Sequence, residues 1–485
     1  MLAAYTAQEV RAAEEPLLAA GPPGALMERA AFALSVAAVR ELRTRGRRVP
    51  GARVLALVGG GNNGGDALHA AAYLARRGAA ATAALLTSQP HAEGAAAALA
   101  AGVRLVPLPP GGDDAAAVAR ELALTADLWF DAVAGIGVRG SLREPAASVL
   151  RALGAERRRR PCPPLVIAVD TPSGIGIDDG TLPGPVLPAD VTVTMGVPKP
   201  GLLLPPAAGL VGDLHVVDIG IAAPLAERTP TVTRLSGVDA ARDWPAPGPE
   251  DHKYRRGVVG LVAGSGRYPG AGVLAAAGAS RAGVGMIRYL GDPAVLRLIH
   301  AGHPEVVGAA GQVQSWVLGS GIDPADPVAM DGLAAALELA LRNGLPTVLD
   351  AGALALLGGA SSPADRLTPR VVLTPHAGEL AALLQERGFD GLRRGDVEAE
   401  PARWARCAAI ETGATVLLKG AVTVVAGPSG SLFAQSDATA WLATAGAGDV
   451  LAGLLGAVLA GRSEDLVRAP ELAARLAAVA ALVHG

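Results

Sequence analysis

The chain has 485 residues and a formal net charge of −3, so its length predicts at least two domains and its charge does not favour nucleic acid or an anionic membrane surface as a partner. Its two cysteines, Cys162 and Cys407, lie far apart, which excludes a disulfide scaffold or a thiolate metal site and is typical of a reducing cytoplasm. The first residues lack the pattern of a signal peptide, and no stretch is apolar enough to span a membrane.

The first half of the chain alternates helices with short apolar strands. Residues 7–48 have helical spacing, and residues 53–58 read as a buried strand that leads through a glycine turn into a helix ending near residue 77. Further strands are expected at residues 103–108, 127–131, 165–170, 190–195 and 214–218. This order predicts an α/β fold, with a doubly wound, Rossmann-like domain of three α/β/α layers at the N-terminus.

Polar side chains follow several of these strands. Asn63, Asp131, Asp170 and Ser173 all project from the edge formed by the carboxyl ends of the strands, where open α/β sheets bind ligands. Their oxygens suit a hard cation or a ribose, and Asp170 is placed to transfer a proton. Each residue alone is a common turn or cap residue; their convergence is what indicates a site.

The segments GGGNNGGDALHAAAYLARRG, DAVAGIG, VDTPSG and TVTMGVPKPG resemble the NAD(P)HX epimerase domain, over a domain that we place at residues 1–225. The resemblance implies interconversion of the R and S forms of hydrated NADH or NADPH, with Asp170 as acid and base. It implies a potassium ion bound by Asn63, Asp131 and Ser173. The implied substrate-binding residues are Asn62, Asn63, Gly64, Gly65, Asp66, Gly135, Ile136, Gly137, Val138, Arg139, Gly140, Ser141 and Asp170. Ala67 stands where the family usually has glycine.

The second half of the chain starts the α/β pattern again. Residues 226–249 are rich in proline and charge and are expected to form a linker. A strand at residues 258–263, a glycine turn, an alanine-rich helix and another strand at 285–290 then predict a second doubly wound domain over residues 250–485.

Lysine is rare in this chain. Only three of the 42 lysine and arginine residues are lysines, Lys199, Lys253 and Lys419, which leaves 39 arginines. A remaining lysine is therefore a candidate for a role that needs a compact ammonium group. Lys419 follows a strand of an expected hairpin, where it could hold a phosphate as a point charge. His376 stands in a turn that opens a helix, and we expect it to contact a substrate.

The stretch Thr444–Gly453, TAGAGDVLAG, runs from a glycine turn into an apolar helix. A helix that starts here would point free N–H groups at an anion, and Asp449 would take a proton from a hydroxyl group that is being phosphorylated. The alternative is that Asp449 is an ordinary N-cap residue.

The segments HKYRRG, AGSGRYPGA, VLDAGAL, LTPHAGEL, LLKG and GAGDVLAG resemble the ribokinase-like ADP-dependent NAD(P)HX dehydratase. The resemblance implies that Ala271, Gly321, His376 and Asp449 contact the hydrate, and that ADP binds with Mg²⁺. The implied nucleotide-binding residues are Lys419, Gly420, Ala421, Val422, Thr423, Thr439, Thr444, Ala445, Gly446, Ala447 and Gly448. Gly352 replaces a usual aspartate, and Ala447 a common serine.

Together these features predict a cytoplasmic, bifunctional repair enzyme for hydrated nicotinamide cofactors. Its catalytic residues would be Asp170 for epimerisation and Asp449 for dehydration, with ADP, Mg²⁺ and K⁺ as co-substrate and ions. Alanine-rich helices favour self-association, so we expect a homo-oligomer. The alternative is a small-molecule alcohol kinase fused to a non-catalytic nucleotide-binding or scaffold domain.

Overall fold

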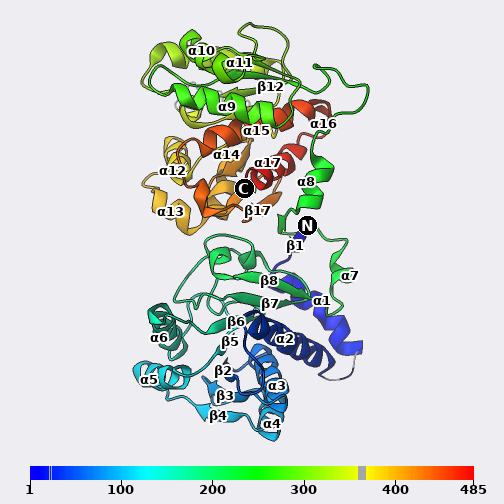
Figure 1. Cartoon of the computed structure of the whole chain (residues 1–485), viewed down its shortest axis with the longest axis vertical. Helices are drawn as coiled ribbons and strands as arrows, with labels where there is room; N and C mark the ends of the chain where they lie inside the picture. The colour runs from blue at the N-terminus through cyan, green and yellow to red at the C-terminus, as the bar shows by residue number, and fades with distance from the viewer. Residues whose placement is uncertain (21, 23, 359–366) are drawn as a thin grey trace. The chain divides into compact units, whose positions relative to one another are not determined.

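The alternating strands and helices fold into two separate units, each a sheet covered by helices (Figure 1). The N-terminal unit comprises residues 3–231, and the C-terminal unit comprises residues 1–2 and 232–485. The computed structural model describes residues 1–20, 22, 24–358 and 367–485. The predicted fold class, two doubly wound α/β domains, is confirmed.

The sheet of the N-terminal unit is parallel throughout, and the described residues give it seven strands in the order β4-β3-β2-β5-β6-β7-β8. The strand order reverses between β2 and β5, which is where doubly wound sheets bind their ligands. The strands are β2 (Arg53–Val58), β3 (Ala80–Leu85), β4 (Arg104–Pro107), β5 (Leu128–Ala132), β6 (Leu165–Val169), β7 (Val191–Met195) and β8 (Asp213–Val217).

Helices cover both faces of this sheet because successive strand side chains point to opposite sides. Val54, Ala56 and Val58 of β2 pack in one core with α2, α3 and α4, whereas Leu55 and Leu57 pack in another with α5 and α6. The helices of the unit are α1 (Ala7–Ala20), α2 (Ala25–Thr44), α3 (Asn62–Arg76), α4 (Ala92–Ala100), α5 (Gly112–Ala123), α6 (Ala146–Arg159), α7 (Ala222–Leu225) and the 3₁₀ turns η1 (Pro200–Leu202) and η2 (Ala207–Leu210).

The strand β3 and the helix α4 of this unit are among the elements that were not predicted. The strand β3 has the sequence AATAAL, and helix α4 is also mostly alanine. Alanine is a poor strand former. β3 nevertheless pairs with β2 along its whole length, from Arg53 opposite Ala80 to Val58 opposite Leu85. Tertiary pairing therefore overrides a weak local preference here.

The C-terminal unit has a ten-stranded sheet among the described residues, in the order β1-β9-β17-β16-β15-β14-β13-β12-β10-β11. Pairings from β11 to β15 are parallel, and β16 is antiparallel to both of its neighbours, which confirms the predicted hairpin. The strands are β1 (Leu2–Ala4), β9 (Val232–Arg234), β10 (Val258–Val262), β11 (Met286–Tyr289), β12 (Ser315–Leu318), β13 (Thr347–Leu349), β14 (Val371–Leu373), β15 (Thr415–Leu418), β16 (Thr423–Ala426) and β17 (Leu432–Gln435).

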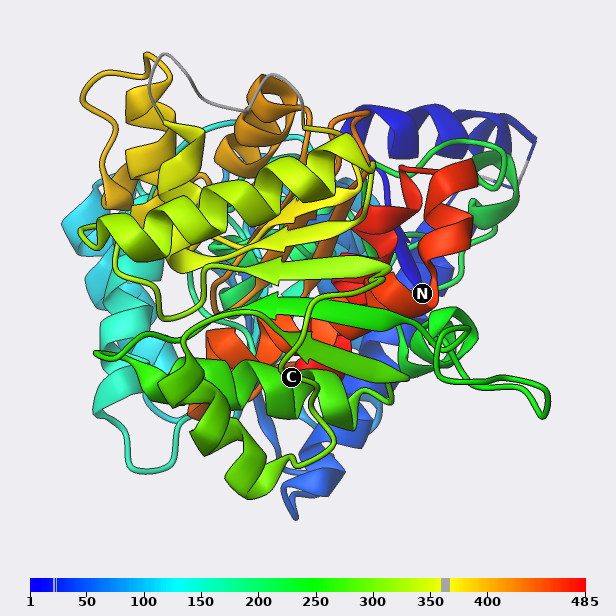
Figure 2. The same ribbon diagram turned by 90° about the horizontal axis from the view of Figure 1, so that it is seen from above.

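Figure 2 shows α9 and α11 on opposite sides of this sheet. One core joins α9, α15 and α17 to the strands, and α11 and α14 pack against other strand positions. None of the described helices is long and apolar enough to cross a bilayer. The helices are α8 (Gly237–Asp243), α9 (Pro269–Arg281), α10 (Pro293–Gly302), α11 (Pro327–Arg342), α12 (Ala377–Glu386), α13 (Arg394–Ala399), α14 (Pro401–Thr412), α15 (Ala447–Gly461), α16 (Ser463–Arg468), α17 (Leu472–His484) and the 3₁₀ turns η3 (Ala351–Leu357) and η5 (Ala440–Leu442).

The expected linker at residues 226–249 is not an unstructured connection. It contains β9, which pairs with β17, and α8, which begins with a capping box between Ser236 and Asp239. The α-amino group of Met1 lies 2.8 Å from Asp239. The C-terminal unit therefore starts at Val232, earlier than the boundary at residue 250 that proline content suggested.

Candidate active sites

The predicted residues of the N-terminal unit gather where the strand order reverses. Asn62–Asp66 form the first turn of α3, directly after β2, and the loop from Gly135 follows β5. A Cβ atom on Gly64 would lie 2.3 Å from the carbonyl oxygen of Gly59, so this turn requires glycine. A Cβ atom on Gly135 would lie 3.3 Å from that of Asn63, which brings the two loops together.

Asp131 and Ser173 form a buried pair beside this turn. Both are fully buried, and Oδ2 of Asp131 accepts a hydrogen bond of 2.8 Å from the Ser173 amide. Burial raises the pKa of the Asp131 carboxyl, and the bonds from Ser173 oppose that shift. The Oδ1 and Nδ2 atoms of Asn63 are buried and have no hydrogen-bond partner. An unpaired buried amide oxygen beside a buried carboxylate suits an oxygen-liganded cation.

Asp170 stands at the end of β6 in an unusual backbone conformation, with φ of 62°, which residues other than glycine rarely adopt. Its Oδ1 accepts hydrogen bonds from the hydroxyl of Thr194 and the amide of Met195, both at 3.0 Å, and from the ammonium of Lys199. The sequence did not assign Lys199 or Thr194 to the site. The rarity of lysine was the available signal for Lys199.

Two further carboxyl groups face Asp170. Burial raises the pKa of Asp66 well above its usual range, and the charges of Asp170 and Glu14 add to the shift. Burial also raises the pKa of Glu14, which Lys199 lowers and Asp170 raises. Glu14 comes from α1, a helix in which no site residue was predicted.

The remaining predicted residues of this unit lie along one loop. The carbonyl oxygen of Ile136 accepts a hydrogen bond of 2.9 Å from Arg11 of α1. Gly137, Val138, Arg139, Gly140 and Ser141 are exposed. This loop therefore has room to contact a ligand, and no described hydrogen bond ties these five residues into the sheet beyond the turn from Gly135 to Val138.

In the C-terminal unit, the glycine turn opens α15 as predicted. Gly446 is the N-cap residue with φ of 91°, and Asp449 is the third residue of the helix. Asp449 is thus not the N-cap residue of this helix. The alternative explanation of Asp449 as an ordinary cap is therefore wrong. The free backbone N–H groups of this first turn therefore lie at the same end of α15 as Asp449.

Asp449 lies within the electrostatic reach of two other charges. Its pKa is raised to about 6, because burial and the charge of Asp350 raise it by more than the charge of Lys419 lowers it. Asp350 is buried at the end of β13, where its Oδ1 accepts hydrogen bonds of 2.8 Å from Lys419 and Thr374 and its Oδ2 accepts one of 2.8 Å from Ser320. A Cβ atom on Gly448 would lie 3.4 Å from Nζ of Lys419. Lys419 therefore borders the glycine turn while pairing with Asp350, a partner that was not predicted.

His376 is the N-cap residue of α12, at the start of a helix as the sequence indicated. Its Nδ1 accepts hydrogen bonds of 3.1 Å from the amides of Gly378 and Glu379, and the His376 amide donates one of 2.8 Å to Oε2 of Glu379. Its side chain is 57% exposed, and His376 pairs with Lys419 through an isolated bridge between adjacent chain segments. Its Nε2 lies 3.6 Å from Oε1 of Glu379, and the exposure of the ring leaves it able to contact a substrate.

Ala271 and Gly321 meet where the strand order of this sheet reverses, between β10 and β12. A Cβ atom on Gly321, whose φ is 67°, would lie 2.3 Å from that of Ala271. Close packing also explains the glycine at position 352, because a Cβ atom there would lie 2.3 Å from the carbonyl oxygen of Ile322. A side chain at position 352 therefore requires the backbone to move.

The predicted nucleotide-binding residues belong to two segments. Residues 420–422 form the turn of the hairpin between β15 and β16, and Thr423 begins β16. Thr439 caps η5, and residues 444–448 lead into α15. Lys419 links the segments, because it precedes the hairpin turn and approaches Gly448.

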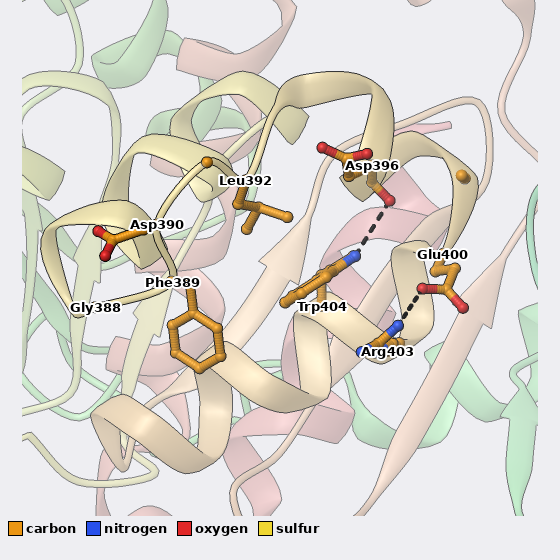
Figure 3. Close-up of a pocket in the computed structure, with 10 residues that line it drawn as sticks. Gly388, Phe389, Asp390, Leu392, Asp396, Glu400, Arg403 and Trp404 are labelled. Carbon is orange, nitrogen blue, oxygen red and sulfur yellow. Dashed lines mark hydrogen bonds and ion pairs between the residues drawn. The ribbon is translucent and has the colours of Figure 1, made fainter.

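A separate pocket of about 600 Å³ lies among α13, α14 and the loop before them (Figure 3). Phe389 and Trp404 make an edge-to-face contact there, Arg403 stacks on Trp404, and Trp404 donates a hydrogen bond to the carbonyl oxygen of Asp396. None of the residues predicted to bind substrate or nucleotide lines this pocket. The aromatic rings in this pocket therefore already contact each other and the guanidinium of Arg403.

Both halves of the chain match known families. A family model described as YjeF-related protein N-terminus matches residues 23–201, and one described as NAD(P)H-hydrate dehydratase matches residues 259–485. The bifunctional NAD(P)H-hydrate repair enzyme of Mycobacterium tuberculosis is 41% identical over 462 residues, which cover 94% of this chain and 89% of that protein. The chain belongs to the family of bifunctional NAD(P)H-hydrate repair enzymes.

Two further proteins are similar to this chain. The bifunctional enzyme of Mycobacterium leprae is also 41% identical, over 94% of this chain and 89% of its own length. An ADP/ATP-dependent NAD(P)H-hydrate dehydratase from Bacillus subtilis, crystallised with ATP and Mg²⁺, is 26% identical over 52% of this chain and 87% of its own, with a TM-score of 0.43.

Proposed function

We propose that this chain repairs hydrated NADH and NADPH with two separate sites. The N-terminal unit interconverts the R and S hydrates, and the C-terminal unit dehydrates the S hydrate at the expense of ADP, giving NAD(P)H, AMP and phosphate. Family membership supports both activities. The observation that carries the second is the position of Asp449 in the first turn of α15, beside Lys419 and a glycine turn. The two free cysteines favour a cytoplasmic location.

In the dehydratase reaction, Asp449 takes the proton from the 6-hydroxyl group while that oxygen attacks the β-phosphorus of ADP and AMP leaves. The N–H groups at the start of α15 and the ammonium of Lys419 stabilise the phosphoryl oxygens. The lone pair of the ring nitrogen then expels phosphate from C6. Loss of a proton from C5 restores the ring double bond. A base with a pKa of about 6 is ionised at neutral pH, as this role requires.

In the epimerase reaction, Asp170 handles the proton of the same hydroxyl group. As that proton leaves, a carbonyl forms at C6 and the bond between C6 and the ring nitrogen breaks. Attack of the nitrogen on the other face of this carbonyl, with return of the proton to the oxygen, gives the other epimer. Asn62–Asp66 and Gly135–Ser141 would hold the substrate above Asp170. The accessible Oδ2 atom of Asp170 supports this role, since all of the described hydrogen bonds to its carboxylate reach Oδ1.

The residues present fit a potassium ion in the N-terminal unit. The unpaired amide oxygen of Asn63, the carboxylate of Asp131 and the hydroxyl of Ser173 would hold it. Such an ion fixes the loops that hold the substrate. The C-terminal unit has no cluster of three acidic, histidine or cysteine ligands among its described residues, so Mg²⁺ would arrive bound to the phosphates of ADP.

The experiment that tests this proposal supplies the purified chain with each hydrate separately, with and without ADP and Mg²⁺. The proposal expects the S hydrate to give NADH only with ADP, and the R hydrate to give the S hydrate without it. A stable phosphoester of the substrate in place of NADH would instead favour the alcohol-kinase alternative.

A further inference from the structure

Lys199 is the only fully buried lysine of the three, with 1% of its side chain exposed. A buried ammonium group is costly unless its hydrogens are all bonded. Nζ of Lys199 donates to Oδ1 of Asp170, to the hydroxyl of Thr194 at 3.0 Å and to the carbonyl oxygen of Met195 at 3.1 Å. All three N–H bonds of the ammonium are therefore used at one place, the end of β7 next to Asp170.

Asp170 is held from several directions at once. Its amide donates to the carbonyl oxygen of Val193 at 2.8 Å, and its Oδ1 accepts three hydrogen bonds, from Thr194, Met195 and Lys199. Its side chain is 14% exposed. No described hydrogen bond reaches its Oδ2. One oxygen of the carboxylate is thus saturated by the protein, and the other is left for a ligand.

We propose that Lys199 is a positioning residue for the epimerase reaction, which fixes the Asp170 carboxylate so that only Oδ2 meets the substrate. This inference rests on the epimerase activity proposed above. Arginine could not replace Lys199, because its planar guanidinium cannot bring three donors to one point inside a closed cavity. The inference accounts for a lysine at this position in a chain that otherwise uses arginine.

The charges around Asp170 give Lys199 a second effect. Glu14 and Arg11 face the site from α1, Asp66 faces it from α3, and Lys199 lies behind it. The carboxyl groups of Glu14 and Asp66 repel a charge on Asp170. The ammonium of Lys199 is the one positive charge in direct contact with Asp170 among the described residues, and it offsets this repulsion.

The test compares the kinetics of R and S exchange in the wild type and in Lys199→Met and Lys199→Arg variants of the full chain. We expect Lys199→Met to lower kcat about 100-fold while KM changes less than about threefold, because positioning acts on the reacting proton rather than on binding. The acidic limb of the pH–rate profile should move to higher pH, because a positive charge next to the carboxylate is lost. Lys199→Arg should not restore kcat.

A buried substitution can disturb folding, so a pair of matched variants on β7 accompanies it. Thr194→Val removes one donor to Asp170, and Thr192→Val removes a buried hydroxyl that bonds the carbonyl oxygen of Val211 at 2.6 Å, away from Asp170. We expect Thr194→Val to lower kcat about fivefold and shift the pH profile, and Thr192→Val to change neither.

Two outcomes would overturn the inference. One is a Lys199→Met variant with wild-type kcat and pH profile; the other is an equal loss of kcat in both threonine variants, which would indicate a structural role only. Absence of exchange in the wild type would instead refute the epimerase assignment itself, so the two failures are distinguishable.

Discussion

The ammonium of Lys419 lies 2.8 Å from Oδ1 of Asp350, at the ends of two strands of the C-terminal sheet. Both charges act on Asp449, in opposite directions. Burial is the largest cause of the raised pKa of Asp449, the residue to which we assign proton abstraction, and the two members of this ion pair adjust that pKa further.

The dehydratase should lose activity in acid. A general base must be ionised, so kcat/KM for the S hydrate should fall tenfold for each unit below the pKa of Asp449, which is about 6. Asp350→Asn removes a negative charge and should move this limb to lower pH, whereas Lys419→Met should move it to higher pH. The measurement that checks this is the pH at the midpoint of each kcat/KM profile, rather than its maximal value. Unchanged midpoints in both variants would contradict the assignment.

The two activities should be separable by single substitutions. Asp449→Asn should lower dehydration of the S hydrate about 1,000-fold while leaving epimer exchange intact, because the residue that accepts the proton is lost. Asp170→Asn should do the reverse. Chromatographic separation of the epimers together with NADH assays measures both rates in one sample. If either variant lost both activities, the two-site account would fail.

The packing of α9 against α15 should depend on glycine. A Cβ atom on Gly453 would lie 1.9 Å from the carbonyl oxygen of Ala275, so Gly453→Ala should destabilise the C-terminal unit by about 3 kcal/mol. Gly332 in α11 has open space around it, and Gly332→Ala should stabilise by about 0.5–1 kcal/mol. Urea unfolding measures both changes. Equal effects of the two variants would show that the close approach of the helices is not required.

Epimer exchange should depend on potassium. Replacing KCl by NaCl at equal ionic strength should slow exchange about tenfold, and Asn63→Ala should abolish this difference, because the variant lacks a predicted ligand. Dehydration of the S hydrate serves as the internal control and should respond to neither change. An equal rate of epimer exchange in both salts by the wild type would contradict the proposed potassium site.

The sequence predicted what depends on local pattern. The strand pattern located Asp131 and Asp170 at the ends of neighbouring parallel strands, which meet at one edge of the sheet, and the glycine turn located Asp449 in the first turn of a helix. It could not predict partners that come from distant elements. Glu14 reaches its site from α1, and Asp350 meets Lys419 although 69 residues separate them. The linker expectation failed for a related reason, since β9 is defined by its pairing with β17 rather than by its own residues.

The central claim is that two independent sites on one chain restore NADH from both of its hydrates. The most direct measurement is the recovery of the near-ultraviolet absorbance of NADH from a mixture of the two epimers with ADP and Mg²⁺. The account predicts full recovery by the wild type, recovery of only the S share at the enzymatic rate by Asp170→Asn, and none by Asp449→Asn. No recovery by the wild type, with a phosphorylated substrate accumulating instead, would contradict it.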